Sequence, residues 1–91
     1  MVRIAKSTRA GKKWMATFKD GTVTHFGDTN YDDYTQHGDV KRREAYRTRH
    51  RKDLDTGDYK RAGYLSYHIL WGKHKNIKEN ILVYKRRYGL V

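Results

Sequence analysis

The chain of 91 residues contains no cysteine and no proline. Without cysteine it can form no disulfide, no thiolate nucleophile and no cysteine-based zinc site. Aliphatic material is also scarce, because leucine, isoleucine, valine and phenylalanine together account for only 16 residues. No segment approaches the roughly 18 consecutive apolar residues of a membrane-spanning helix, so no membrane insertion is expected. A chain of this length forms at most one domain, and we expect its core to be thin.

Tyrosine and basic residues are abundant instead. Eight of the twelve aromatic residues are tyrosine, and the formal net charge is +11. This charge is uneven, because residues 25–40 sum to −4 while residues 1–24, 41–61 and 62–91 each sum to +5. A basic chain with one acidic island attracts polyanions, of which nucleic acid and acidic protein surfaces are the most obvious.

The pattern along the chain predicts an α+β fold in one small basic domain, residues 1–91. Residues 1–27 alternate apolar and polar side chains on both sides of Asp20-Gly21, which predicts an antiparallel β-hairpin or a three-stranded meander. Asp-Gly is typical of a tight primed turn, since glycine accepts a positive φ. Residues 28–38 are rich in glycine, aspartate, threonine and asparagine, and are predicted to form a linker.

Residues 39–91 are predicted to form two or three helices that fold over the sheet. Asp39 can cap the first of these, a strongly basic helix over residues 40–54. Residues 62–72 are the most apolar stretch and predict a short helix buried on most sides, ended by its glycine. The spacing of a capping box at Asn76 predicts the start of a last helix.

Histidines and aspartates gather in the middle of the chain, where they could in principle bind a metal ion or act as acids and bases. Their spacing matches no metal-binding helix motif, and no patterned nucleophile or glycine-rich phosphate loop is present. We therefore predict a protein that is not an enzyme and that has no catalytic residue, metal or cofactor. Five of these side chains are interpreted as a structural latch between the sheet and the basic helix, namely His25, Asp33, His37, Asp39 and His50.

Basic residues are concentrated in the helix that follows and at the end of the chain. The arginine fork matches phosphate and carboxylate groups alike, so these residues can bind a polyanion or an acidic partner. A solvated helix surface is the alternative interpretation of such a charge run. The predicted partner-binding residues are Lys41, Arg42, Arg43, Arg47, Arg49, Arg51, Lys52, Lys85, Arg86 and Arg87.

Several short motifs follow one another in a distinctive order. They are His25-Phe26-Gly27, Tyr31 to Tyr34, His37-Gly38-Asp39, Arg42 to Tyr46, Arg49 to Lys52, Ala62-Gly63 and Ser66 through Trp71. In this combination they resemble a family of small, uncharacterised basic proteins encoded by large nucleocytoplasmic DNA viruses, such as phycodnaviruses and mimivirus-like viruses. The resemblance implies a protein of the virus particle or of its genome handling, and it implies no reaction.

Two functions of different classes follow from this resemblance. The preferred one is a minor capsid or virion-associated structural protein that bridges larger subunits by contacting their acidic surfaces. Such a protein would be found in the virion, and in the host cytoplasm or viral factory during assembly. The alternative is a sequence-nonspecific protein that binds double-stranded DNA during genome packaging or replication. The structural role is preferred because the basic charge is spread over three segments and the acidic island interrupts it.

Overall fold

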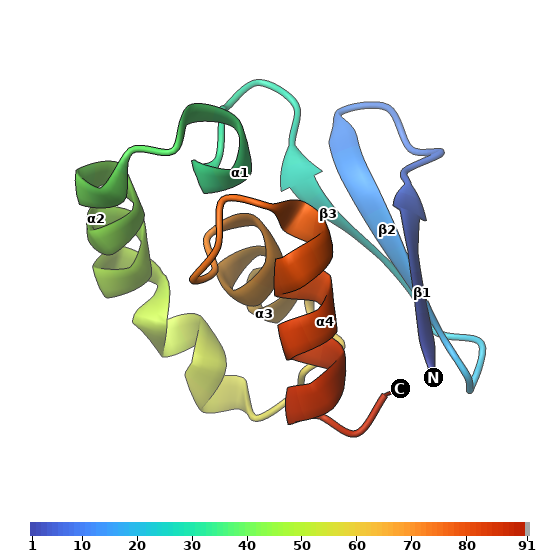
Figure 1. The fold of residues 1–91 in the computed structure, drawn as a ribbon. Coiled ribbons are helices and arrows are strands. Elements are labelled where there is room, and N and C mark those ends of the chain that lie inside the picture. Colours follow the sequence, from blue (N-terminus) through green and yellow to red (C-terminus); the bar gives the residue numbers. More distant parts are fainter. Residues whose placement is uncertain (91) are drawn as a thin grey trace.

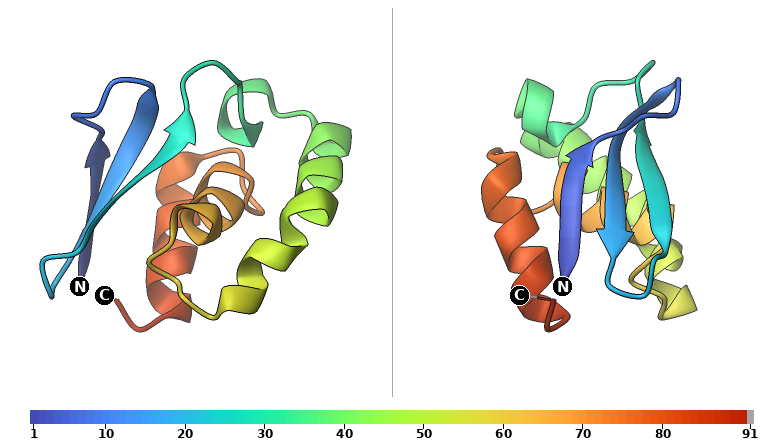
Figure 2. Two further views of the ribbon diagram at one scale, coloured as in Figure 1. Left: turned by 180° about the vertical axis from the view of Figure 1, so that it is seen from behind. Right: turned by 90° about the vertical axis from the view of Figure 1, so that its right-hand side faces the viewer.

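The structure is a computed structural model that describes residues 1–90. A three-stranded antiparallel sheet is followed by helices that pack on one of its faces (Figure 1), which confirms the predicted α+β fold. Chain ends lie side by side at one end of the sheet, as the views in Figures 1 and 2 agree.

The sheet is a meander in which each strand pairs with the next. Its strands are β1 (Val2–Lys6), β2 (Lys12–Phe18) and β3 (Val23–Asp28), in the order β1-β2-β3. Alternation places every second side chain on the helix side of the sheet. The buried side chains on this face are Val2, Ala16, Phe18 and Phe26. The other face carries no helix in the right-hand view of Figure 2.

The turn between β2 and β3 differs from the predicted two-residue primed turn. The amide of Gly21 donates to the carbonyl of Phe18 (3.0 Å), and Phe18 pairs with Thr22 across a three-residue loop. Only Gly21 in this loop has a positive φ (90°), which is typical of a loop closed by a glycine bulge. The third loop residue sets the register so that Val23 lies on the open face of the sheet, where its side chain is 49% exposed.

The rest of the described chain contains the helices and the turns that join them. The helices are α1 (Tyr34–His37), α2 (Val40–His50), the 3₁₀ segment η1 (Arg51–Thr56), α3 (Ala62–Leu65), the π-helical segment η2 (Ser66–Leu70) and α4 (Ile77–Arg87). The predicted linker therefore contains the end of β3 and one helical turn. The basic helix is also shorter than predicted, because its α-helical part ends at His50 and the chain tightens into η1.

The helical core is built on α3 and η2, which lie between the sheet, α2 and α4 in Figure 1. Leu65, Ile69 and Leu70 from this segment are almost fully buried and pack with Phe26 and with Tyr84 of α4. Tyr84 is the largest fully buried side chain, and its hydroxyl donates to the carbonyl of Tyr59. Tyrosine thus supplies core volume that the scarce aliphatic residues do not.

The connection from η2 to α4 is closed by a buried asparagine. The Asn80 side chain donates to the carbonyls of Ile69 (2.8 Å) and His74 (2.6 Å), and it accepts from the amide of His74 (2.9 Å). Gly72 was predicted as a left-handed helix cap, but its φ is not positive. Glycine is required here by close approach instead, because a Cβ would lie 2.2 Å from the carbonyl oxygen of His68 and 2.8 Å from Asn80 Oδ1.

Candidate partner-binding cleft

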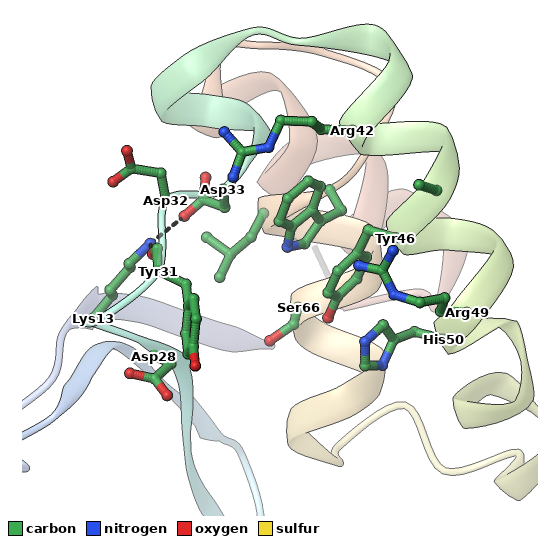
Figure 3. Close-up of a pocket in the computed structure, with 14 residues that line it drawn as sticks. Lys13, Asp28, Tyr31, Asp32, Asp33, Arg42, Tyr46, Arg49, His50 and Ser66 are labelled. Atoms are coloured by element: carbon green, nitrogen blue, oxygen red, sulfur yellow. Dashed lines mark hydrogen bonds and ion pairs between the residues drawn. The ribbon is translucent and has the colours of Figure 1, made fainter.

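A cleft of about 530 Å³ opens between the turn that follows β3 and helix α2 (Figure 3). Its floor comes from Ser66, Leu70 and Trp71 at the end of the central helical segment. Pockets of this size are typical of ligand or peptide binding. We refer to this space as the charged cleft, because its two walls carry opposite charge.

The acidic wall is held against the sheet by Lys13. The ammonium group of Lys13 donates to Asp33 Oδ2 (2.8 Å) and to the carbonyl of Tyr31 (2.6 Å). Asp33 is buried and caps α1 by accepting from the amide of Thr35 (2.9 Å), while Gln36 completes a capping box. This network fixes the turn but leaves the exposed carboxylates of Asp28 and Asp32 without an ion-pair partner among residues 1–90.

The basic wall is one flank of α2. Asp39 starts this helix by accepting from the amides of Lys41 (3.0 Å) and Arg42 (3.2 Å). Arg42 and Arg49 are seven residues apart, close to two helical turns, so both lie on the side that faces the cleft, about 10 Å apart along the axis. The small side chain of Ala45 lies between them and leaves the cleft open.

The aromatic side chains of the cleft stack on one another. Tyr46 lies between Trp71, whose ring centroid is 4.2 Å away at an angle of 7°, and His50, at 4.1 Å and 22°. Burial raises the pKa of the Tyr46 hydroxyl to about 12, and the negative charge of Asp53 adds to this effect. The phenol is therefore neutral at physiological pH, and both faces of its ring are covered.

Two of the predicted partner-binding arginines face inward, which corrects the prediction. Arg47 donates to the carbonyls of Trp71 (2.8 Å) and Tyr67 (3.4 Å), and its guanidinium lies 4.2 Å from the Tyr67 ring centroid. Arg43 donates to the carbonyls of Gly72 (3.3 Å) and Lys73 (3.2 Å). Cations next to the last carbonyls of a helix are stabilising, so Arg47 caps η2 from α2, while Arg43 binds the turn that follows η2.

The other predicted basic residues remain on the surface. Lys41, Arg42, Arg49, Arg51 and Lys52 are exposed on α2 and η1, whereas Arg86 and Arg87 are exposed and Lys85 is half-buried on α4. None of these eight forms an ion pair within the part of the chain that the structure describes. These side chains are therefore available to a partner.

The five residues predicted to form one latch have separate partners instead. His37 and Asp39 do meet, because the amide of Asp39 donates to His37 Nδ1 (2.8 Å). His25 bonds Ser7 (2.7 Å), and His50 lies 3.1 Å from Asp53. The remaining one, Asp33, binds Lys13 as described above. The His37–Asp39 and His50–Asp53 contacts are local, whereas Ser7–His25 and Lys13–Asp33 join segments 18 and 20 residues apart. The connection from sheet to helix therefore depends on several separate contacts and not on one polar cluster.

Within residues 1–90, no three histidine or acidic side chains are grouped so that they could hold a metal ion. No helix in that part of the chain is long and apolar enough to span a bilayer.

Comparison with known proteins gives one match. A protein-family model described as "Family of unknown function (DUF5754)" matches residues 2–50, just over half of the chain. The matched span covers the sheet, α1 and α2, and so includes both walls of the charged cleft. Comparison with curated proteins and with solved structures found no match.

Proposed function

The chain belongs to the DUF5754 family, whose description carries no activity, and on the basis of its charged cleft we propose that it is a small non-enzymatic structural protein that binds and bridges larger protein subunits. The setting that we propose is the particle of a large DNA virus, as the sequence motifs imply. The protein would be present in the virion, and in the host cytoplasm or viral factory during assembly.

The observation that carries this proposal is the pairing of opposite charges across the cleft. Arg42 and Arg49 line one side of the cleft and Asp28 and Asp32 line the other, with Leu70 and Trp71 between them (Figure 3). A phosphate backbone would be attracted by one wall and repelled by the other. A protein surface that carries both acidic and basic side chains is complementary to both walls, and such complementarity gives specificity to protein interfaces.

The distribution of the remaining surface charge supports a protein partner over DNA. Once Arg43 and Arg47 are occupied within the fold, the other predicted partner-binding residues divide between α2–η1 and α4, and further exposed lysines and arginines lie on the sheet and in loops. Binding of duplex DNA favours one continuous basic face. The net charge of +11 still favours weak, nonspecific contact with nucleic acid. The test must therefore distinguish a protein partner from DNA.

The proposal is tested by quantitative mass spectrometry of purified virus particles, intact and after removal of the genome with nuclease. A structural protein is expected to keep its ratio to the major capsid protein in emptied particles. Loss of the protein together with the DNA would contradict the proposal and favour genome packaging.

A further inference from the structure

The side chains that line the charged cleft indicate which kind of protein segment it can bind. Its four charged side chains have no ion-pair partner among residues 1–90, although they line one space. The charged groups of the two walls are therefore too far apart to form ion pairs with each other. A ligand that neutralises both must present anions toward α2 and cations toward the Asp28–Asp32 turn.

The stacked rings of the floor offer no free face to a nucleotide base, whereas the exposed ring of Tyr31, which also lines the cleft, does. Tyr46 is covered on both faces by Trp71 and His50, and a third ring, that of His37, lies 5.3 Å from Trp71. Base recognition by stacking needs a free aromatic face. The floor therefore offers a base no such face on Tyr46, and the carboxylates of the opposite wall would repel its phosphates.

An extended peptide satisfies both walls with the simplest geometry. Successive side chains of an extended chain point to opposite sides. A peptide that lies along the cleft therefore directs its odd positions to one wall and its even positions to the other. Acidic residues at every second position would meet Arg42 and Arg49, and the basic residues between them would meet Asp28 and Asp32.

The arginine wall fits carboxylates in particular. Planar guanidinium groups bind carboxylates through two parallel hydrogen bonds, which fixes the direction of the peptide side chain. Hydroxyl groups near the floor, on Tyr46 and Ser66, can bond the peptide backbone of the occupant.

We infer that the charged cleft binds an extended segment of a protein partner in which acidic and basic residues alternate. This inference rests on the proposed function, because it specifies the protein partner of the same site. It adds a sequence requirement that a general attraction of the basic helix to acidic proteins would not impose.

Titration of the ¹⁵N-labelled protein with three blocked hexapeptides tests the inference. The probes are an alternating (Glu-Lys)₃ peptide, a Glu₃-Lys₃ peptide of identical composition, and hexaglutamate. The alternating peptide is expected to shift the amides of Gly27 and Ala45 and the indole of Trp71 saturably, with an affinity at least about tenfold above the block peptide, as one additional ion pair would give.

Two matched pairs of variants locate the binding. Arg49→Glu and Asp32→Lys are expected to weaken the alternating peptide at least about tenfold, because each reverses one wall of the cleft. Arg9→Glu and Asp55→Lys make the same charge changes at exposed positions outside the cleft and are expected to leave the affinity unchanged.

Equal binding of the alternating and block peptides would overturn the inference, as would saturable shifts confined to other surfaces. Tighter binding of hexaglutamate, strengthened further by Asp32→Lys, would show that the cleft selects anions alone. The proposed function fails separately, since it is decided by retention in emptied particles. A protein retained there with no peptide selectivity would dock through another surface.

Discussion

At the scale of single residues, arginines two positions apart on one helix have different roles. Arg47 lies against Tyr67 and caps η2, whereas Arg49 is exposed at the cleft. Sequence alone does not separate them, because the carbonyls that bind Arg47 belong to residues 20 and 24 positions further along the chain. Charge counts therefore overestimate the surface that is available to a partner.

Substitution of Arg47 tests whether this residue contributes more to the stability of the fold than Arg49 does. We expect Arg47→Ala to lower the free energy of unfolding by about 2 kcal/mol, from the lost charged hydrogen bonds and the contact with the tyrosine ring. Arg49→Ala is the matched control and should change it by less than about 0.5 kcal/mol. Chemical denaturation of both variants measures the difference. Equal effects would mean that Arg47 is as exposed as Arg49.

His68 provides a second prediction, on the dependence of stability on pH. Burial lowers its pKa to about 4, and the positive charges of Arg87 and Arg47 contribute. Because the unfolded chain binds a proton at this site near pH 6.5 and the folded chain does not, stability is lost as the pH falls from 6.5 to 4. His68→Gln keeps a polar side chain near the Tyr88 hydroxyl and removes this titration.

The measurement for His68 is thermal unfolding of both proteins at a series of pH values. The difference in melting temperature between pH 7 and pH 4.5 should be smaller in His68→Gln than in the natural sequence. The same acid destabilisation in both proteins would assign the effect to other groups.

At the scale of elements, the central helical segment organises the fold. It changes from α3 to the π-helical η2 without interruption, and its end is closed by Asn80 from α4 and by Arg47 from α2. Side chains from two other helices, α2 and α4, thus bind carbonyl groups at the end of the central segment. Periodicity predicted the segment and its burial but could not show the π-helical geometry, which depends on these contacts.

The close approach at Gly72 can be tested by adding one methyl group. Gly72→Ala should destabilise the protein by about 3 kcal/mol, because its Cβ would collide with backbone at the end of η2. Gly57→Ala has open space around its Cβ and should cost only about 1 kcal/mol, from its positive φ of 66°. Thermal unfolding of both variants gives the comparison, and equal losses would show that backbone conformation governs both positions.

Elements near the sheet were the most predictable part of the chain. Alternation around Asp20-Gly21 predicted a hairpin or a three-stranded meander, of which the structure has the meander, and Asp39 was identified as the cap of α2. The contribution of Lys13 was not predictable, because a lysine in a strand gives no sign that it will bind a turn 20 residues later. Local patterns thus predicted the elements, while the pairing of distant polar groups required the structure.

At the scale of the whole molecule, the charge is large but not organised as one face. The acidic turn lies opposite the basic flank of α2, and the other cations are spread over the sheet, the loops and α4. A protein of this kind attracts acidic surfaces from many directions. It binds firmly only to a surface whose acidic and basic groups are complementary to both walls of the charged cleft.

Binding to duplex DNA should accordingly be weak. At 150 mM salt we expect a dissociation constant no tighter than about 1 μM for a random 20-base-pair duplex, in the range of nonspecific binding. The slope of log K against log salt should be shallow, because few cations contact the duplex at once. Fluorescence anisotropy over a salt series measures both. Nanomolar affinity with a slope near −7 would indicate that about eight cations bind phosphate at once.

The central claim is that the α2 side of this protein meets carboxylates of larger subunits. Zero-length carbodiimide cross-linking of intact particles tests it most directly, because it joins a lysine only to a carboxylate in contact with it. The account predicts cross-links from Lys41 and Lys52 to aspartate or glutamate residues of capsid subunits, retained after the genome is removed. Cross-links confined to α4, at Lys78 and Lys85, or no cross-links to capsid subunits at all, would contradict it.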